Sequence, residues 1–131
     1  MRIAHVAVWT ADLERLVEFY VRYFGARPGR KYLNPVRQFE SYFLDFEDGA
    51  RLELMRVPDL APRPTASGGE GEIEGPAHLA FSTGSKEKVD ALTEDLRRDG
   101  HRIVGEPRRT GDGYYESVAL DPDGNRIEIA I

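Results

Sequence analysis

The chain has 131 residues, enough for one domain that buries about two-thirds of its unfolded surface. Its apolar content of 40% and charged content of 31% are ordinary for a soluble globular protein, and its net charge of −5 disfavours a nucleic-acid partner. Without cysteine it has no disulfides, thiolate metal sites or cysteine nucleophile, so a metal would need nitrogen and oxygen ligands. The sequence shows neither a signal peptide nor an apolar run near the ~20 residues of a membrane span, so we expect a cytoplasmic protein with no membrane partner.

The first part of the chain predicts a strand, a helix and then further strands. Residues 2–9 alternate in polarity as a strand does. Apolar residues then recur at helical spacing between Thr10, the expected N-cap, and Gly25, the expected stop signal. Residues 27–33 predict a strand interrupted by proline and glycine, and residues 39–56 predict a hairpin around an Asp-Gly turn.

A change of composition marks the middle of the chain. Residues 57–75 are rich in proline and glycine and show no periodicity, which is typical of a loop. We interpret them as a linker between two modules, about 1–56 and 76–131, of a single domain that spans residues 1–131. The same segment could also cover a cleft as a lid.

The last part of the chain repeats the plan of the first. Residues 77–83 predict a strand, and a helix is expected between Ser85, its N-cap, and Gly100, its stop. Residues 103–104 belong to a short strand, and residues 115–131 form a second hairpin around an Asp-Gly turn. Each half is therefore expected to be a strand, a helix and three strands, which indicates a duplicated unit.

The two hairpins also match residue by residue. Both contain a Glu-Ser pair in the first strand and Arg-x-Glu in the second. Glu40 and Glu116 are 76 residues apart, whereas Glu53 and Glu128 are 75 apart, so we expect the turn of the second copy to be one residue shorter.

Side-chain parity brings two histidines and two glutamates to one face of the predicted strands. Successive side chains in a strand point to opposite faces, and branched apolar residues alternate with His5, Glu53, His78 and Glu128. Because the helices must cover the apolar face, the four polar residues are expected on the other face. Taken singly, each is more often an ordinary surface residue. The repetition of both types at matching points favours a divalent-metal site with open positions for Lewis-acid catalysis.

These residues, together with the run from Leu120 to Glu128, resemble the vicinal oxygen chelate superfamily over essentially the whole chain. The resemblance implies an α+β fold in which tandem βαβββ modules form an open eight-stranded cup around a metal, the glyoxalase/bleomycin resistance/dioxygenase fold. Within the superfamily, a complete His-Glu-His-Glu set is similar to that of glyoxalase I, or lactoylglutathione lyase.

The glyoxalase resemblance implies a lyase or isomerase of methylglyoxal detoxification. Such an enzyme converts the hemithioacetal of a 2-oxoaldehyde and a thiol to a 2-hydroxyacyl thioester through an enediolate that the metal stabilises. The implied ligands of a divalent Ni, Co, Zn, Mn or Fe ion, with Ni or Zn favoured, are His5, Glu53, His78 and Glu128. Glu128 is the implied catalytic base and Glu53 its partner. The resemblance also implies a homodimer, and it leaves open whether each site lies within one chain or is shared by two.

The substrate end of the site differs from that of the glutathione-using relatives. Trp9 and Val57 stand where those enzymes commonly have Arg and Asn, so the identity of the thiol substrate is left open. Candidate contacts to a small-molecule substrate are Trp9, Arg37, Met55, Tyr115 and Arg109. Two alternatives use the same cup: an epimerase of an acyl-CoA, and a non-catalytic small-molecule or drug-binding protein with an aromatic wall that includes Trp9.

Overall fold

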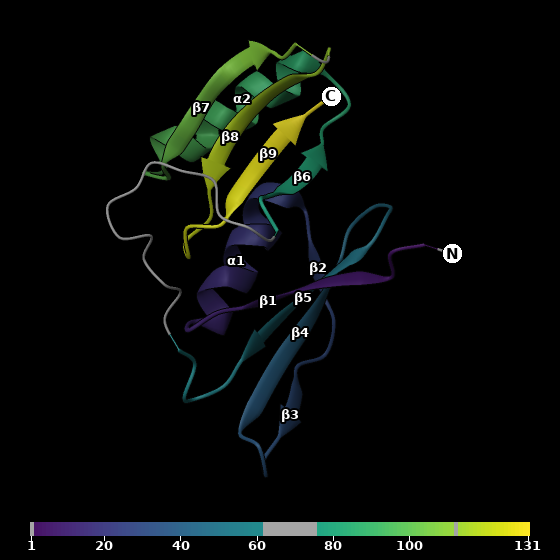
Figure 1. Cartoon of the computed structure of the whole chain (residues 1–131), viewed down its shortest axis with the longest axis vertical. Helices are drawn as coiled ribbons and strands as arrows, with labels where there is room; N and C mark the ends of the chain where they lie inside the picture. Colours follow the sequence, from purple (N-terminus) through teal and green to yellow (C-terminus); the bar gives the residue numbers. More distant parts are fainter. Residues whose placement is uncertain (1, 62–75, 112) are drawn as a thin grey trace. The chain divides into compact units, whose positions relative to one another are not determined.

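The computed structural model describes residues 2–61, 76–111 and 113–131 (Figure 1). The chain divides into two compact units, Met1–Gly69 and Glu70–Ile131. Each unit consists of one sheet and one helix (Figure 1). Most of the predicted linker, with its possible lid, lies outside the described residues.

The first unit is a mixed sheet with one helix. Its elements in chain order are β1 (His5–Trp9), α1 (Leu13–Phe24), β2 (Arg27–Pro28), β3 (Tyr32–Asn34), β4 (Phe39–Asp45) and β5 (Arg51–Arg56). The strand order is β1-β5-β4-β2, with β3 also paired to β4. β1 runs parallel to β5, and the other pairs are antiparallel.

The second unit repeats this plan. Its elements are β6 (Leu79–Ser82), α2 (Lys86–Arg98), β7 (Ile103–Arg109), β8 (Tyr115–Leu120) and β9 (Arg126–Ala130). The strand order β6-β9-β8-β7 again places the first strand parallel to the last. The predicted α+β class and the order of a strand, a helix and further strands in each half are therefore confirmed. In the described parts of the chain, neither helix has the length and apolar character needed to cross a membrane.

Two local predictions for the first unit were wrong in detail. The N-cap of α1 is Asp12, whose Oδ1 accepts the backbone N–H of Arg15 at 3.2 Å, while the Thr10 hydroxyl oxygen instead accepts the N–H of Asp12 at 3.1 Å. The strand predicted at 27–33 is two short strands, β2 and β3, on the same edge of β4, separated by residues 29–31.

Each helix covers the apolar face of its own sheet. In the first unit the buried apolar residues of these elements are Leu13, Leu16, Val17, Phe19 and Tyr20 of α1 and Leu44, Leu52 and Leu54 of the sheet. In the second unit they are Val89, Thr93 and Leu96 of α2 and Ser117, Ala119, Ile127 and Ile129 of the sheet. The opposite face of each sheet is left for the candidate site.

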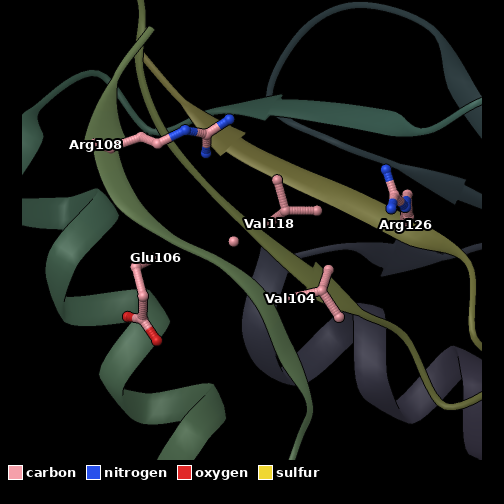
Figure 2. Close-up of a pocket in the computed structure, with 6 residues that line it drawn as sticks. Val104, Glu106, Arg108, Val118 and Arg126 are labelled. Carbon is pink, nitrogen blue, oxygen red and sulfur yellow. The ribbon is translucent and has the colours of Figure 1, made fainter. Parts of the chain in front are cut away.

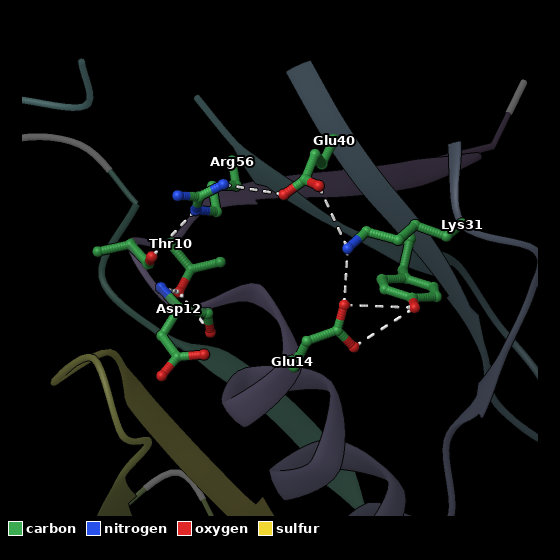
Figure 3. Close-up of polar contacts among 8 residues, drawn as sticks. Thr10, Asp12, Glu14, Lys31, Glu40 and Arg56 are labelled. Carbon is green, nitrogen blue, oxygen red and sulfur yellow. Dashed lines mark hydrogen bonds and ion pairs between the residues drawn. The ribbon is translucent and has the colours of Figure 1, made fainter. Parts of the chain in front are cut away.

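A chain of charges fixes the start of α1 to the strands of its unit (Figure 3). Lys31 donates to Glu14 at 2.7 Å and lies 3.3 Å from Glu40, which in turn accepts from Arg56 at 3.0 Å. Arg56 also donates to the carbonyl of Ala11 at 3.3 Å. Arg56 and Lys31, in that order, hold the pKa of the Glu40 carboxyl below its usual value. The network ties β5 to the helix.

The register of the hairpins corrects the predicted alignment of the two copies. Phe43 pairs with Glu53 in the first hairpin, and Val118 pairs with Glu128 in the second. Val118 is therefore the counterpart of Phe43, and the second turn is not shorter than the first. Glu40 and Glu116, matched in the sequence, lie on opposite faces of their sheets because a one-residue shift exchanges the faces.

Candidate metal and substrate site

The first histidine and glutamate of the predicted set meet on the open face of the first sheet. Ala7 pairs with Glu53 across β1 and β5, so His5, two residues before Ala7, shares the face of Glu53. The Nε2 atom of His5 lies 3.8 Å from Oε2 of Glu53. Parallel pairing of the first and last strands is what brings together two residues that are far apart in the sequence.

The second unit forms the same pair. Ala80 pairs with Glu128 across β6 and β9, and His78 immediately precedes β6 on the same side. The Nε2 atom of His78 lies 3.2 Å from Oε2 of Glu128. The duplicated plan therefore delivers one imidazole and one carboxylate at equivalent points of both units.

Both pairs are open to a ligand. The histidine side chains are 43% and 41% exposed, whereas the glutamates beside them are 15% and 23% exposed. Nitrogen and oxygen donors of these types fit Ni, Co, Zn, Mn or Fe. Among the described residues, no three metal-ligating side chains gather at one point.

Phe43 and Arg51 lie beside the first pair, and neither was singled out from the sequence as a site residue. The Phe43 ring lies edge-on to the His5 ring at 5.3 Å between centroids. The Arg51 guanidinium lies over the same Phe43 ring at 4.2 Å, a cation–π contact. The repeated Arg-x-Glu pattern could have predicted the place of Arg51, because residues two apart in a strand lie on the same face as each other.

Trp9 and Met55, two of the predicted substrate contacts, lie on this same face. They pair with each other at the far end of β1 and β5. The Trp9 ring contacts that of Phe39 at 6.1 Å, and Tyr32 contacts Phe39 at 6.0 Å. Trp9 and Tyr32 are 46% and 55% exposed, so the face continues from the His5–Glu53 pair into an accessible aromatic cluster.

The structure does not bring the other predicted contacts to these pairs. Arg37 lies in the turn between β3 and β4, where its backbone N–H donates to Asn34 at 3.1 Å. Arg109 ends β7, paired with Tyr115. The Tyr115 hydroxyl donates to Asp90 of α2 at 2.7 Å, so this side chain lies on the helix side of its sheet. That hydrogen bond is the main reason why the pKa of Asp90 is lowered and that of Tyr115 is raised.

The turn before Glu128 is fixed by one carboxylate. Asp121 is nearly buried and accepts hydrogen bonds from the backbone N–H groups of Asp123 and Asn125 and from the Asn125 side chain, at 2.9, 2.8 and 2.7 Å. It thereby sets the direction in which β9 leaves the turn.

Two units, each a strand, a helix and further strands with a histidine and a glutamate on the sheet face that the helix leaves open, define the class of this protein. The model of the Glyoxalase/Bleomycin resistance protein/Dioxygenase superfamily matches residues 2–129. The chain therefore belongs to this superfamily, and the predicted resemblance is confirmed.

Named relatives are distant. The chain is 30% identical to the lactoylglutathione lyase of Haemophilus influenzae, over 98% of this chain and 90% of that protein. It is 29% identical to lactoylglutathione lyase GLX1 of Arabidopsis thaliana, over 98% of this chain, but it spans only 43% of that protein's length. A solved glyoxalase family protein from Enterococcus faecalis aligns with a TM-score of 0.77 at 25% identity, covering 98% of this chain and 96% of that one.

Proposed function

We propose that this protein is a metal-dependent, glyoxalase I-like lyase or isomerase that acts on the hemithioacetal of a 2-oxoaldehyde and a thiol. The observation that carries the proposal is the duplicated pair of histidine and glutamate, at 3.8 Å and 3.2 Å in the two units. Membership of the superfamily and relatives named lactoylglutathione lyase support it.

The donor set supports a divalent metal as the cofactor. His5, Glu53, His78 and Glu128 together offer two imidazole nitrogens and two carboxylates, and each pair alone offers only half of that set. We propose that the two pairs hold one ion, either within a chain or between the chains of a homodimer. When bound, such an ion supplies Lewis-acid stabilisation of the negative charge that develops on the two adjacent oxygens of the substrate.

The glutamates are assigned the proton transfers. The Glu128 carboxylate removes the proton from the carbon that bears the sulfur and returns it to the neighbouring carbon, which becomes the alcohol carbon of the product. Glu53 moves the hydroxyl proton between the two oxygens. The hemithioacetal and the 2-hydroxyacyl thioester are isomers, so the reaction needs no oxidant, reductant or co-reactant.

The test is thioester formation from methylglyoxal with several thiols, measured with Ni, Co, Mn and Zn in turn. We expect turnover that depends on the metal and that Glu128→Gln abolishes. Glu18→Gln, an exposed glutamate of α1, is the matched control and should leave turnover unchanged. Failure of thioester formation with every metal and thiol would refute the proposed reaction.

The aromatic cluster of Trp9, Phe39 and Tyr32 favours a second candidate, a non-catalytic binder of small molecules. Trp9 is the single tryptophan of the chain, so its fluorescence reports ligand binding at this cluster directly. If the protein is a binder, an aromatic ligand should quench the Trp9 fluorescence, and this quenching should persist after a chelator is added. No turnover should be detected. Loss of the quenching on chelation would count against the binder and in favour of a metal-dependent site.

A further inference from the structure

The two repeats differ at the residue that lies across from the metal-binding glutamate. In the first unit this residue is Phe43, whose ring fills the space between His5 and Arg51. In the second unit the counterpart is Val118, and a hollow of about 370 Å³ lies beside it. The hollow lies between Val118 and β7, whereas the Phe43 ring packs toward His5 of β1.

We call this space the β7–β9 hollow; its lining residues are Val104, Gly105, Glu106, Arg108, Val118 and Arg126 (Figure 2). Gly105 is needed for its shape, because a Cβ at that position would lie 3.1 Å from the Cβ and Cγ2 atoms of Val118. A larger residue at position 105 would therefore disturb the hollow.

Two guanidinium groups, those of Arg108 and Arg126, and the Glu106 carboxylate line the hollow. Arg108 and Arg126 lie on either side of Val118 (Figure 2). Arg108 is 3.5 Å from Glu116, which holds it in place. The Glu106 carboxylate is turned toward α2, where Arg97 donates to it at 2.6 Å and 3.1 Å, so its charge is offset away from the hollow.

We propose that the β7–β9 hollow binds the carboxylate of a short, carboxylate-bearing thiol whose hemithioacetal reacts at Glu128. This assignment rests on the proposed function and deepens it by naming the class of thiol. Val104 and Val118 offer contacts to the methylene groups of the thiol, and planar guanidinium groups suit the carboxylate geometry. Val118 pairs directly with Glu128, so the hollow adjoins the reacting centre.

The spacing along β9 limits the length of the ligand. Arg126 and Glu128 are two residues apart on one face, so their Cα atoms are separated by about 7 Å. We therefore choose a short thiol, with about two or three carbons between the sulfur and the carboxylate. 3-Mercaptopropionate meets this requirement. 2-Mercaptoethanol, similar in size but neutral, is the matched comparison ligand.

The test measures binding of these two thiols to the full chain without metal or methylglyoxal, by NMR shifts of the Gly105 and Val118 amides. We expect the carboxylate thiol to bind about 10-fold more tightly than the neutral one. Arg126→Gln should remove this preference, and Val118→Phe, which copies the first repeat, should remove both the shifts and the binding. Arg51→Gln, the same change at the equivalent position of the first repeat, should keep the preference.

Equal affinity for the two thiols, or equal loss in Arg126→Gln and Arg51→Gln, would overturn the assignment. The binding measurement also separates this assignment from the proposed reaction. If no thiol supports turnover while binding that depends on Arg126 persists, the reaction is refuted and the carboxylate site stands.

Discussion

Val118 lies directly across the β8–β9 ladder from Glu128, in the position that Phe43 occupies across from Glu53. Phe43 packs against His5 and beneath Arg51, whereas Val118 borders an open hollow. The two repeats thus offer the same ligand types in different surroundings. We therefore expect equivalent substitutions in the two repeats to weaken metal binding alike but to affect catalysis differently.

Substitution of the two glutamates tests this expectation. Glu53→Gln and Glu128→Gln each remove one anionic ligand, so each should weaken metal binding at least about 10-fold. Glu128→Gln should also lower kcat by about 10²-fold or more, because it removes the assigned base. Metal content after dialysis, measured by mass spectrometry, and kcat for the best thiol check both points. Glu18→Gln is the control and should keep its metal. Unchanged metal content in both glutamate variants would contradict the ligand assignment.

Asp121 is expected to be the most sensitive position of the second hairpin. Asp121→Ala removes the acceptor of three hydrogen bonds at a nearly buried position, so the free energy of unfolding should fall by about 2–3 kcal/mol. Asp48→Ala in the first hairpin is the control, since its exposed carboxylate accepts from the backbone N–H of the neighbouring Gly49. Urea denaturation of both variants measures the difference, and equal losses would contradict the role given to Asp121.

The buried hydroxyls of Thr93 and Ser117 are expected to be coupled. Their oxygens lie 2.6 Å apart, and both residues are fully buried between α2 and β8. Thr93→Val leaves the Ser117 hydroxyl without this partner and should cost about 1–3 kcal/mol. The double variant with Ser117→Ala should cost less than the sum of the single changes, which a double-mutant cycle by denaturation will show. Strict additivity would mean that the contact contributes nothing.

Acid should weaken the ion network around Glu40. Since the folded state lowers the pKa of this carboxyl, its contribution to stability is present above the usual Glu value of about 4.3 and is lost as the pH falls through the folded value. Glu40→Gln should therefore destabilise the protein near neutral pH, by about 1 kcal/mol or less at this partly exposed site, and the difference should shrink below about pH 4. Denaturation at several pH values measures it. A difference that grows in acid would reverse the predicted sign.

The sequence by itself determined the parts of the structure that depend on local periodicity. Alternation along the strands put Leu52 and Leu54 in the core and Glu53 on the open face, and the same alternation placed Ile127, Glu128 and Ile129. Asp-Gly turns located both hairpins, and recurrence of the whole pattern indicated the duplication. These features follow from the strand and helix repeats, which each segment carries in its own residues.

Only the tertiary structure decided how the segments are paired. The Glu-Ser pair that occurs in both hairpins suggested that Glu40 and Glu116 are equivalent. The strand pairing instead places Glu116 on the open face and Glu40 on the helix face. Tyr115 likewise lies toward Asp90 rather than toward Glu128. Register is set by hydrogen bonds and side-chain packing between strands, and a shift of one residue reverses every side chain. The pairing of Val118 with Glu128, and with it the hollow beside Arg126, follows from that register.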